Sequence, residues 1–206
     1  MSETEFSGLK AVVTGASQGI GLAIAQRLAS GGCGVALVAR SIDSLNKNAD
    51  LITASGGTAH AIAADLSLKS DCERAAEAAL AALGACDILV NCAGATRAGI
   101  FPEQPDEDWI DGFALKFHGA VRLTRALWPS LVEQKGTVIN IGGAAAFTPS
   151  PGFMVGGAVN AALAHFSKAL SKQGLKDDVN VNIIHPGMTE TDRLEALITQ
   201  EADATG

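Results

Sequence analysis

The stretch Thr14-Gly15-Ala16-Ser17-Gln18-Gly19-Ile20-Gly21 decides the fold of this chain. It follows a short apolar run at residues 11–13 and leads into an apolar-periodic segment at 20–29, so its glycines fall at a turn between a strand and a helix. Glycine permits a tight bend there and lets a phosphate approach the backbone, while the first N–H groups of the helix stabilise the negative charge. The stretch therefore predicts the pyrophosphate-binding turn of a dinucleotide site.

Short β-branched runs alternate with longer helix-period segments along the rest of the chain, with no repeat or linker between them. This order is typical of βαβ units, and uninterrupted apolar runs are typical of parallel strands that are buried on both faces. The helical segments, such as 20–29 and 109–128, are long enough for right-handed crossovers. We therefore expect an α/β fold with a single Rossmann-like, doubly wound parallel sheet in three layers (α/β/α) and strands at 11–13, 35–39, 59–63, 88–90, 137–141 and 179–184.

The composition indicates one globular domain over residues 1–206. Of these residues, 48% are hydrophobic, enough for a sizeable core. The net charge is −7 and the basic residues occur singly, so we expect no nucleic acid as a partner. No apolar run reaches the roughly 18 residues of a membrane span, and residues 1–6 carry two glutamates and no apolar stretch. These features predict a cytoplasmic protein with no membrane partner.

The four cysteines, Cys33, Cys72, Cys86 and Cys92, show neither CxxC spacing nor histidines at metal-ligand distance. We interpret them as small core residues in a reducing compartment, and we expect no metal site.

The tip of the second predicted strand reads Ala39-Arg40-Ser41. A dinucleotide fold contacts the adenosine ribose here, and an acidic residue would bond the 2′-hydroxyl and repel a 2′-phosphate. Arg40 can instead pair with that phosphate and lie over the adenine, so we expect NADP (NADPH) to be preferred over NAD. Gln18 supplies no second cation, and Arg40 as a solvated surface residue is the alternative.

The spacing of Gly15, Gly19 and Gly21 after a threonine resembles the short-chain dehydrogenase/reductase family, whose turn reads TGxxxGxG. More of the family's pattern follows in order: Asp65 in 64–66, Asn91-Cys92-Ala93-Gly94 where the family has NNAG, and PGxxxT at 186–191. The resemblance extends from Leu9 to about Thr191. It implies that Asp65 holds the adenine, that residues 91–94 line the cofactor, and that Thr189 and Thr191 lie near the carboxamide and the phosphates. The full set of expected cofactor-binding residues is Gly15, Ser17, Gln18, Gly19, Ile20, Gly21, Arg40, Asp65, Leu66, Asn91, Ala93, Gly94, Pro186, Gly187, Thr189 and Thr191.

The pattern breaks at the chemical end. Carbonyl-reducing family members use an Asn, Ser, Tyr and Lys set, and the resemblance places Lys116, Gly143, Gly156 and Asn160 at these four positions. The chain contains no tyrosine at all, so the family's proton donor cannot come from any other position. We therefore expect an atypical member with a non-standard site, because the resemblance alone does not establish activity.

One exchange is visible across this site. Lys116 stands where the family has Asn, and Asn160 stands where it has Lys, which retains an ammonium. At 100° per residue, Lys116 lies about 20° from Trp109 on the apolar stripe of its helix, whereas His118 points to the opposite face. A cation on that stripe is either functional or reaches solvent along its stem. We take Lys116 and Asn160 as candidate catalytic residues, with Lys116 either an acid in carbonyl reduction or a ligand of the ribose hydroxyls.

His185 precedes Pro186 at the carboxyl edge of the sixth predicted strand, where it is either a second proton donor or a histidine bonded to backbone. Gly143 and Gly156 are expected to widen the pocket, unless Phe147, Phe153 or Met154 fills the space. The sequence ends at Gly206, where relatives continue through a substrate-covering helix and a last strand. We therefore expect a domain without that lid, as a truncated chain or a short form with an open pocket.

Two functional hypotheses follow. The first is an NADP(H)-dependent oxidoreductase that acts on a small-molecule carbonyl or alcohol substrate. The second is a catalytically inactive nicotinamide-binding pseudoenzyme or partner subunit. A structural subunit without a cofactor would leave the glycine turn, Arg40 and Asp65 without a purpose. By resemblance, we also expect a homo-oligomer, a dimer or tetramer.

Overall fold

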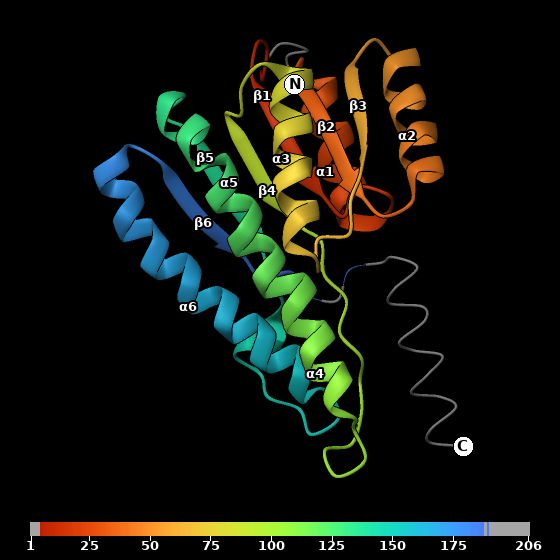
Figure 1. Cartoon of the computed structure of the whole chain (residues 1–206), viewed down its shortest axis with the longest axis vertical. Coiled ribbons are helices and arrows are strands. Elements are labelled where there is room, and N and C mark those ends of the chain that lie inside the picture. Colours follow the sequence, from red (N-terminus) through yellow and green to blue (C-terminus); the bar gives the residue numbers. More distant parts are fainter. Residues whose placement is uncertain (1–4, 188, 190–206) are drawn as a thin grey trace.

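Six parallel strands form one sheet in the order β3-β2-β1-β4-β5-β6 (Figure 1). The structure is a computed structural model that describes residues 5–187 and 189. Each of the six predicted strands is confirmed, with bounds within one residue of those expected. They are β1 (Lys10–Thr14), β2 (Gly34–Ala39), β3 (Thr58–Ala63), β4 (Ile88–Asn91), β5 (Thr137–Ile141) and β6 (Asn180–Ile184).

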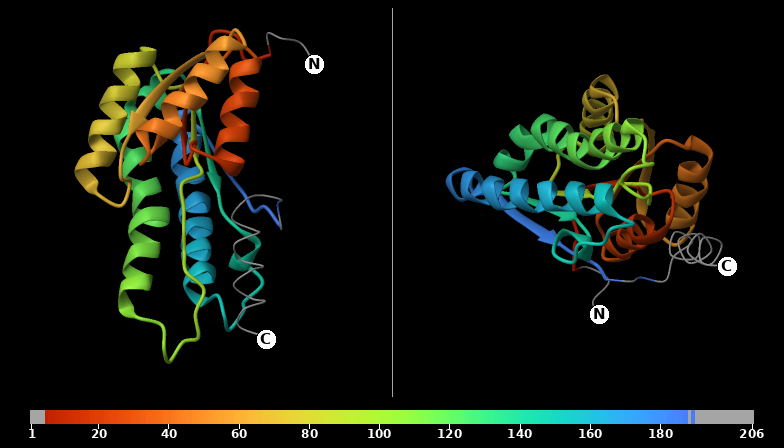
Figure 2. Two further views of the ribbon diagram at one scale, coloured as in Figure 1. Left: turned by 90° about the vertical axis from the view of Figure 1, so that its right-hand side faces the viewer. Right: turned by 90° about the horizontal axis from the view of Figure 1, so that it is seen from below.

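Helices cover both faces of the sheet, which explains why most strand residues are apolar (Figure 2). Successive residues of β1 alternate between two cores: Ala11 and Val13 pack in one, and Val12 in the other. The first core includes buried residues of α1 (Gly19–Ser30) and α2 (Ile42–Ala54). The second includes residues of α3 (Lys69–Leu83) and α5 (Gly119–Glu133), against which Leu170 of α6 (Met154–Asp177) packs. The expected doubly wound, three-layer architecture is confirmed.

The strand order reverses between β1 and β4, which are paired neighbours at the centre of the sheet. Loops that leave such neighbouring strands diverge to opposite faces and open a crevice outside their carboxyl ends. The glycine turn after β1 and the segment after β4 border this crevice, because a Cβ at Gly15 would lie 3.0 Å from Ala93. The fold therefore places the two most diagnostic sequence motifs side by side.

The predicted helix at 109–128 is helical but not uniform. α4 (Asp106–Gly112) passes into a π-helical segment (Phe113–His118) and then into α5. A π turn closes hydrogen bonds five residues apart, so a constant 100° per residue does not hold through it. The angle of about 20° predicted between Trp109 and Lys116 assumed a regular α-helix, so it does not apply here. The predicted burial is nevertheless observed, because His118 is exposed and Lys116 is half-buried.

The cysteines Cys33, Cys72 and Cys86 are buried, Cys92 is half-buried, and all four are free thiols. Burial raises the pKa of Cys86 to about 12 and that of Cys33 to about 11, so both stay protonated at neutral pH. They pack as small core residues, as predicted. Within residues 5–187 and 189, no helix is long and apolar enough to cross a membrane. Cytoplasmic location and self-association remain predictions.

Candidate functional site

The glycine turn has a backbone that other residues would strain. Gly15 and Gly19 have φ of 67° and 58°, in the left-handed region that favours glycine. A Cβ at Gly21 would lie 2.4 Å from the carbonyl oxygen of Gly15, so the first turn of α1 packs directly on the turn. The three glycines thus allow the chain to reverse tightly and to present the N-terminus of α1 to the crevice.

Two polar side chains hold this turn in place. Asn48, buried in α2, donates from its amide to the carbonyl oxygens of Ala16 and Ser17 at 3.2 and 2.9 Å. Thr14 Oγ1 accepts from the N–H groups of Cys92 and Ala93, both at 2.9 Å. The turn is therefore fastened to α2 on one side and to the end of β4 on the other. Neither role was predicted from the sequence, because both side chains bond groups that are distant along the chain.

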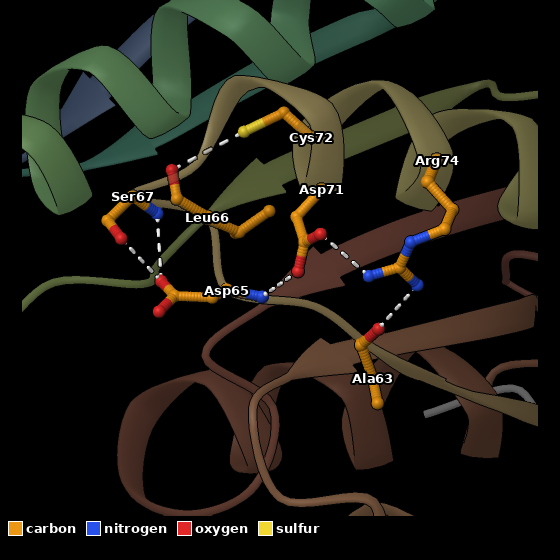
Figure 3. A network of polar contacts seen from close by, with 7 residues as sticks. All are labelled: Ala63, Asp65, Leu66, Ser67, Asp71, Cys72 and Arg74. Atoms are coloured by element: carbon orange, nitrogen blue, oxygen red, sulfur yellow. Dashed lines mark hydrogen bonds and ion pairs between the residues drawn. The ribbon is translucent and has the colours of Figure 1, made fainter.

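Asp65 organises the segment that follows β3 (Figure 3). Its carboxylate accepts from the N–H and the hydroxyl of Ser67 at 3.0 and 2.7 Å, and its own N–H donates to Asp71. Arg74 joins Asp71 to the carbonyl oxygen of Ala63. The N–H of Asp65, followed by Arg74, lowers the pKa of Asp71. This network fixes the path of the chain past Leu66 into the crevice.

A cavity of about 740 Å³ lies outside the carboxyl ends of the strands. Segments that follow all six strands contribute to its wall. Arg40 at the end of β2 and Lys116 of the π-helical segment also line it, and none of the lining residues in the described part of the chain is acidic. From the expected cofactor set, the lining includes Gly15, Ser17, Gln18, Gly19, Ile20, Gly21, Arg40, Leu66, Ala93, Gly94, Pro186, Gly187 and Thr189.

Asp65, Asn91 and His185 were predicted at the site but do not line the cavity. Asp65 instead makes the turn contacts described above, and Asn91 lies in the core. The amide of Asn91 donates to Thr124 Oγ1 at 3.0 Å and to Asn140 Oδ1 at 2.9 Å. Thr191 lies outside the described residues.

Lys116 and Asn160 both lie beside the segment that follows β5, Lys116 at Gly142 and Asn160 at Gly143. Lys116 Nζ donates to the carbonyl oxygen of Gly142 at 3.3 Å, and its stem passes Gly94, where a Cβ would lie 2.7 Å from Lys116 Cδ. A Cβ at Gly143 would lie 3.1 Å from Asn160 Nδ2. The structure therefore brings together the two residues whose types looked exchanged.

Asn160 is almost fully buried, with 4% of its surface exposed. Its Nδ2 donates to the carbonyl oxygen of Gly156 at 2.8 Å, and its Oδ1 is buried without a hydrogen-bond partner. A buried acceptor in this condition costs roughly 1–3 kcal/mol. The residue is also one of those that line the cavity.

The expected widening of the pocket at Gly156 is wrong. A Cβ on Gly156 would lie 2.0 Å from Cε1 and 2.1 Å from Cζ of Phe153, so the phenyl ring occupies the space that a side chain at 156 would need. Phe153 lines the cavity and is half-buried. Of the three residues named as possible fillers, Phe153 takes the space, while Phe147 is 70% exposed and Met154 38%.

His185 is bonded to backbone, which was one of its two predicted alternatives. Its Nδ1 lies 3.0 Å from the carbonyl oxygen of Gly143, and its ring packs edge-on against Phe147 with centroids 4.8 Å apart. A Cβ at Gly142 would lie 2.7 Å from the same nitrogen, so glycine at 142 permits this contact. His185 therefore supports the end of β5 from behind the cavity wall.

Comparison with known proteins agrees with this arrangement. The family model described as short chain dehydrogenase matches residues 10–202. The chain is 34% identical over 191 residues to a short chain dehydrogenase of Pseudocercospora fijiensis. This match covers 91% of the present chain but only 62% of that relative. It is 33% identical over 193 residues to the 3-oxoacyl-[acyl-carrier-protein] reductase of Escherichia coli, covering 93% of itself and 78% of that protein.

Two solved structures are similar over most of the chain. L-sorbose reductase from Gluconobacter frateurii, complexed with NADPH and L-sorbose, is 32% identical with a TM-score of 0.93, and the match covers all of this chain and 79% of that one. A short chain dehydrogenase from Burkholderia cenocepacia in complex with NADP is 33% identical with a TM-score of 0.87, covering 91% and 77% of the two chains. The sequence motifs, the sheet order, the crevice and these matches agree, and the chain belongs to the short-chain dehydrogenase family.

Proposed function

We propose that the protein is an NADP(H)-dependent oxidoreductase that acts on a carbonyl or alcohol substrate through a non-standard site. One observation supports this most: a single cavity connects the glycine turn, Arg40 and Lys116, and its described lining holds no acidic residue. A cavity that is cationic in a protein of net charge −7 suits an anionic ligand such as a phosphorylated dinucleotide.

The residues of the turn fit a dinucleotide. A Cβ atom added at Gly15 or Gly21 would lie 3.0 or 2.4 Å from backbone atoms. The turn therefore has no room for side chains at these two positions, and its backbone is exposed as a surface at the start of α1. The pyrophosphate would lie on that surface, with the adenosine toward Arg40 and the nicotinamide toward Lys116. When bound, the nicotinamide supplies or accepts a hydride.

Lys116 and Asn160 are proposed to hold the reacting oxygen of the substrate. An ammonium near a developing negative charge stabilises it and can donate a proton, which is the work that a phenol performs in relatives. The backbone carbonyl of Gly142 orients Lys116 from the end of β5. This placement supports a catalytic lysine in a chain that contains no tyrosine.

The NADP preference is supported by Arg40 and by the two NADPH- or NADP-bound relatives. Its test is a fluorescence titration of the protein with NADPH and with NADH. We expect tighter binding of NADPH, and we expect Arg40→Asp to weaken NADPH binding at least tenfold while NADH binding changes little. Arg125→Asp, at an exposed position of α5, is the matched control. An unchanged preference in Arg40→Asp would remove Arg40 from this role.

Turnover is tested separately by NADPH oxidation with a panel of aldehydes and ketones. We expect Lys116→Ala to lower kcat by a factor of about 100 to 10,000, the range of a lost general acid. Lys172→Ala, on an exposed turn of α6, controls for the loss of a lysine elsewhere. Tight NADPH binding without turnover of any substrate would favour a cofactor-binding protein without catalysis.

A further inference from the structure

The substrate end of the cavity combines an ammonium, an aromatic ring and a buried amide. Lys116 contacts Gly142 and Asn160 lies beside Gly143, and the ring of Phe153 covers Gly156 one helical turn before Asn160. All three residues line the same cavity. This end therefore offers one positive charge and one aromatic side chain to a substrate.

The position of the Phe153 ring depends on glycine at residue 156. The Cβ atom of any larger residue at 156 would lie only 2.0 and 2.1 Å from Cε1 and Cζ of Phe153, so the ring would have to move. The strand-like bridge between Gly99 and Phe153 and the N–H of Gly157, which donates to the carbonyl oxygen of Phe153, fix the backbone beside the ring. The backbone of Phe153 is therefore held in place at the cavity wall. An aromatic ligand could pack on its ring in an offset or edge-on arrangement.

The chemistry of the product anion then separates classes of carbonyl substrate. Hydride addition to a simple ketone produces an alkoxide that is far more basic than a phenolate, so a strong proton donor must act at once. Hydride addition to a quinone produces a phenolate-type anion, whose conjugate acid resembles the tyrosine phenol with a pKa of about 10. Such an anion needs a neighbouring positive charge more than a dedicated phenol.

Resting on the proposed function, we propose that the substrate is a quinone or a similarly conjugated planar dicarbonyl, with Phe153 against its ring and Lys116 beside the oxygen that becomes negative. In this step the C4–H bond of the reduced nicotinamide would break, and its hydrogen with both electrons would form an O–H bond at one quinone oxygen. The ring would become aromatic and the other oxygen would become negative, which gives the hydroquinone monoanion. One proton from solvent completes the hydroquinone, so NADPH, quinone and H⁺ give NADP⁺ and hydroquinone.

A binding experiment tests the ammonium without any turnover. The probe is 4-nitrophenol, a planar analogue of the product whose phenolate absorbs visible light, titrated by pH in the presence of the protein and NADP⁺. Because an opposite charge within a few ångströms favours the ionised form, we expect the pKa of the bound phenol to be about 1 unit or more below that of the free phenol. Lys116→Met should abolish the shift, whereas Lys172→Met should retain it.

A kinetic experiment tests the ring. We expect the protein to reduce 2-methyl-1,4-naphthoquinone with NADPH faster than it reduces cyclohexanone, after subtraction of the reaction without protein. Phe153→Leu should raise KM for the naphthoquinone by roughly threefold to tenfold, the loss of one ring–ring contact, and Gly156→Ala should act in the same direction by displacing the ring. Phe101→Leu, at an exposed position, is the control.

The outcomes are distinguishable. If NADPH binds but cyclohexanone is reduced as fast as the naphthoquinone, or if the phenol pKa does not shift, the quinone proposal is wrong and the oxidoreductase proposal stands. If Phe153→Leu leaves KM unchanged, the ring does not contact the substrate. If NADPH does not bind at all, the proposed function fails and the quinone proposal fails with it.

Discussion

Gly21 shows how little space the cofactor turn leaves. An added Cβ would lie 2.4 Å from the carbonyl oxygen of Gly15, a backbone atom that cannot rotate away. We expect Gly21→Ala to lower the free energy of unfolding by about 1–3 kcal/mol, as overpacking does, and to weaken NADPH binding at least tenfold. Urea unfolding and fluorescence titration measure the two effects. Gly152→Ala is the control, because nothing lies within 4 Å of its added Cβ, and equal losses in both variants would contradict the argument.

At the same scale, the sequence predicted backbone requirements better than side-chain positions. Gly15 and Gly21 were identifiable because a motif of fixed spacing reflects a fixed backbone path. Lys116 was identifiable because its type departs from the family's pattern. The ring of Phe153 was not, because three nearby apolar residues were equally suitable fillers and only tertiary packing selects one. Asn48 was missed because it lies far along the chain from the turn that it holds.

A buried polar chain crosses four elements behind the site. Asn91 of β4 donates to Thr124 of α5 and to Asn140 of β5, and Asn140 donates to Ser167 of α6. Replacing Asn140 by leucine would remove the acceptor of one Asn91 N–H in a fully buried place. We expect Asn140→Leu to lower the free energy of unfolding by about 1–3 kcal/mol.

Urea unfolding measures this loss, and Asn182→Leu on an exposed position of β6 is the matched control. If both variants lose the same amount of stability, the buried hydrogen bonds contribute nothing beyond strand propensity.

At the scale of elements, the strands were predictable and the long helix only in part. Strands that helices cover are rich in apolar residues, so most of their ends lie beside polar or glycine residues. The π-helical segment Phe113–His118 was not predictable, because a pattern with period 3.6 does not reveal one extra residue in a turn. Phe117 packs edge-on against Phe113 and Phe166 within that region, with centroids 6.1 and 6.0 Å apart.

Across the whole molecule, the buried thiols make stability depend on alkaline pH. Burial raises the pKa of Cys33 and Cys92 to about 11 and that of Cys86 to about 12, from an ordinary value of 9.0. Between about pH 9 and 11 the unfolded chain releases thiol protons that the folded chain keeps, so stability is complete below pH 9 and falls as pH rises through this window.

Urea midpoints at about pH 8, 9 and 10 measure this dependence. In Cys86→Ala, the unfolding free energy should fall less steeply between about pH 9 and 10. The variant lacks one of the thiols that lose a proton on unfolding in this pH range. An identical slope in the variant would show that other groups carry the alkaline loss.

The cofactor is expected to stabilise the molecule as a unit, because the cavity wall is made by segments that follow all six strands. A ligand that binds only the folded state at a hundred times its Kd adds about 2.7 kcal/mol to the free energy of unfolding. For a chain of this size, NADPH should then raise Tm by roughly 5–10 °C. Adenosine 2′,5′-bisphosphate, which matches only the end near Arg40, should bind more weakly and, at the same concentration, raise Tm less. If the fragment stabilised the protein as much as NADPH does, contacts at Lys116 and the β5 end would add nothing to cofactor binding, and the nicotinamide would not lie where the proposed chemistry requires it.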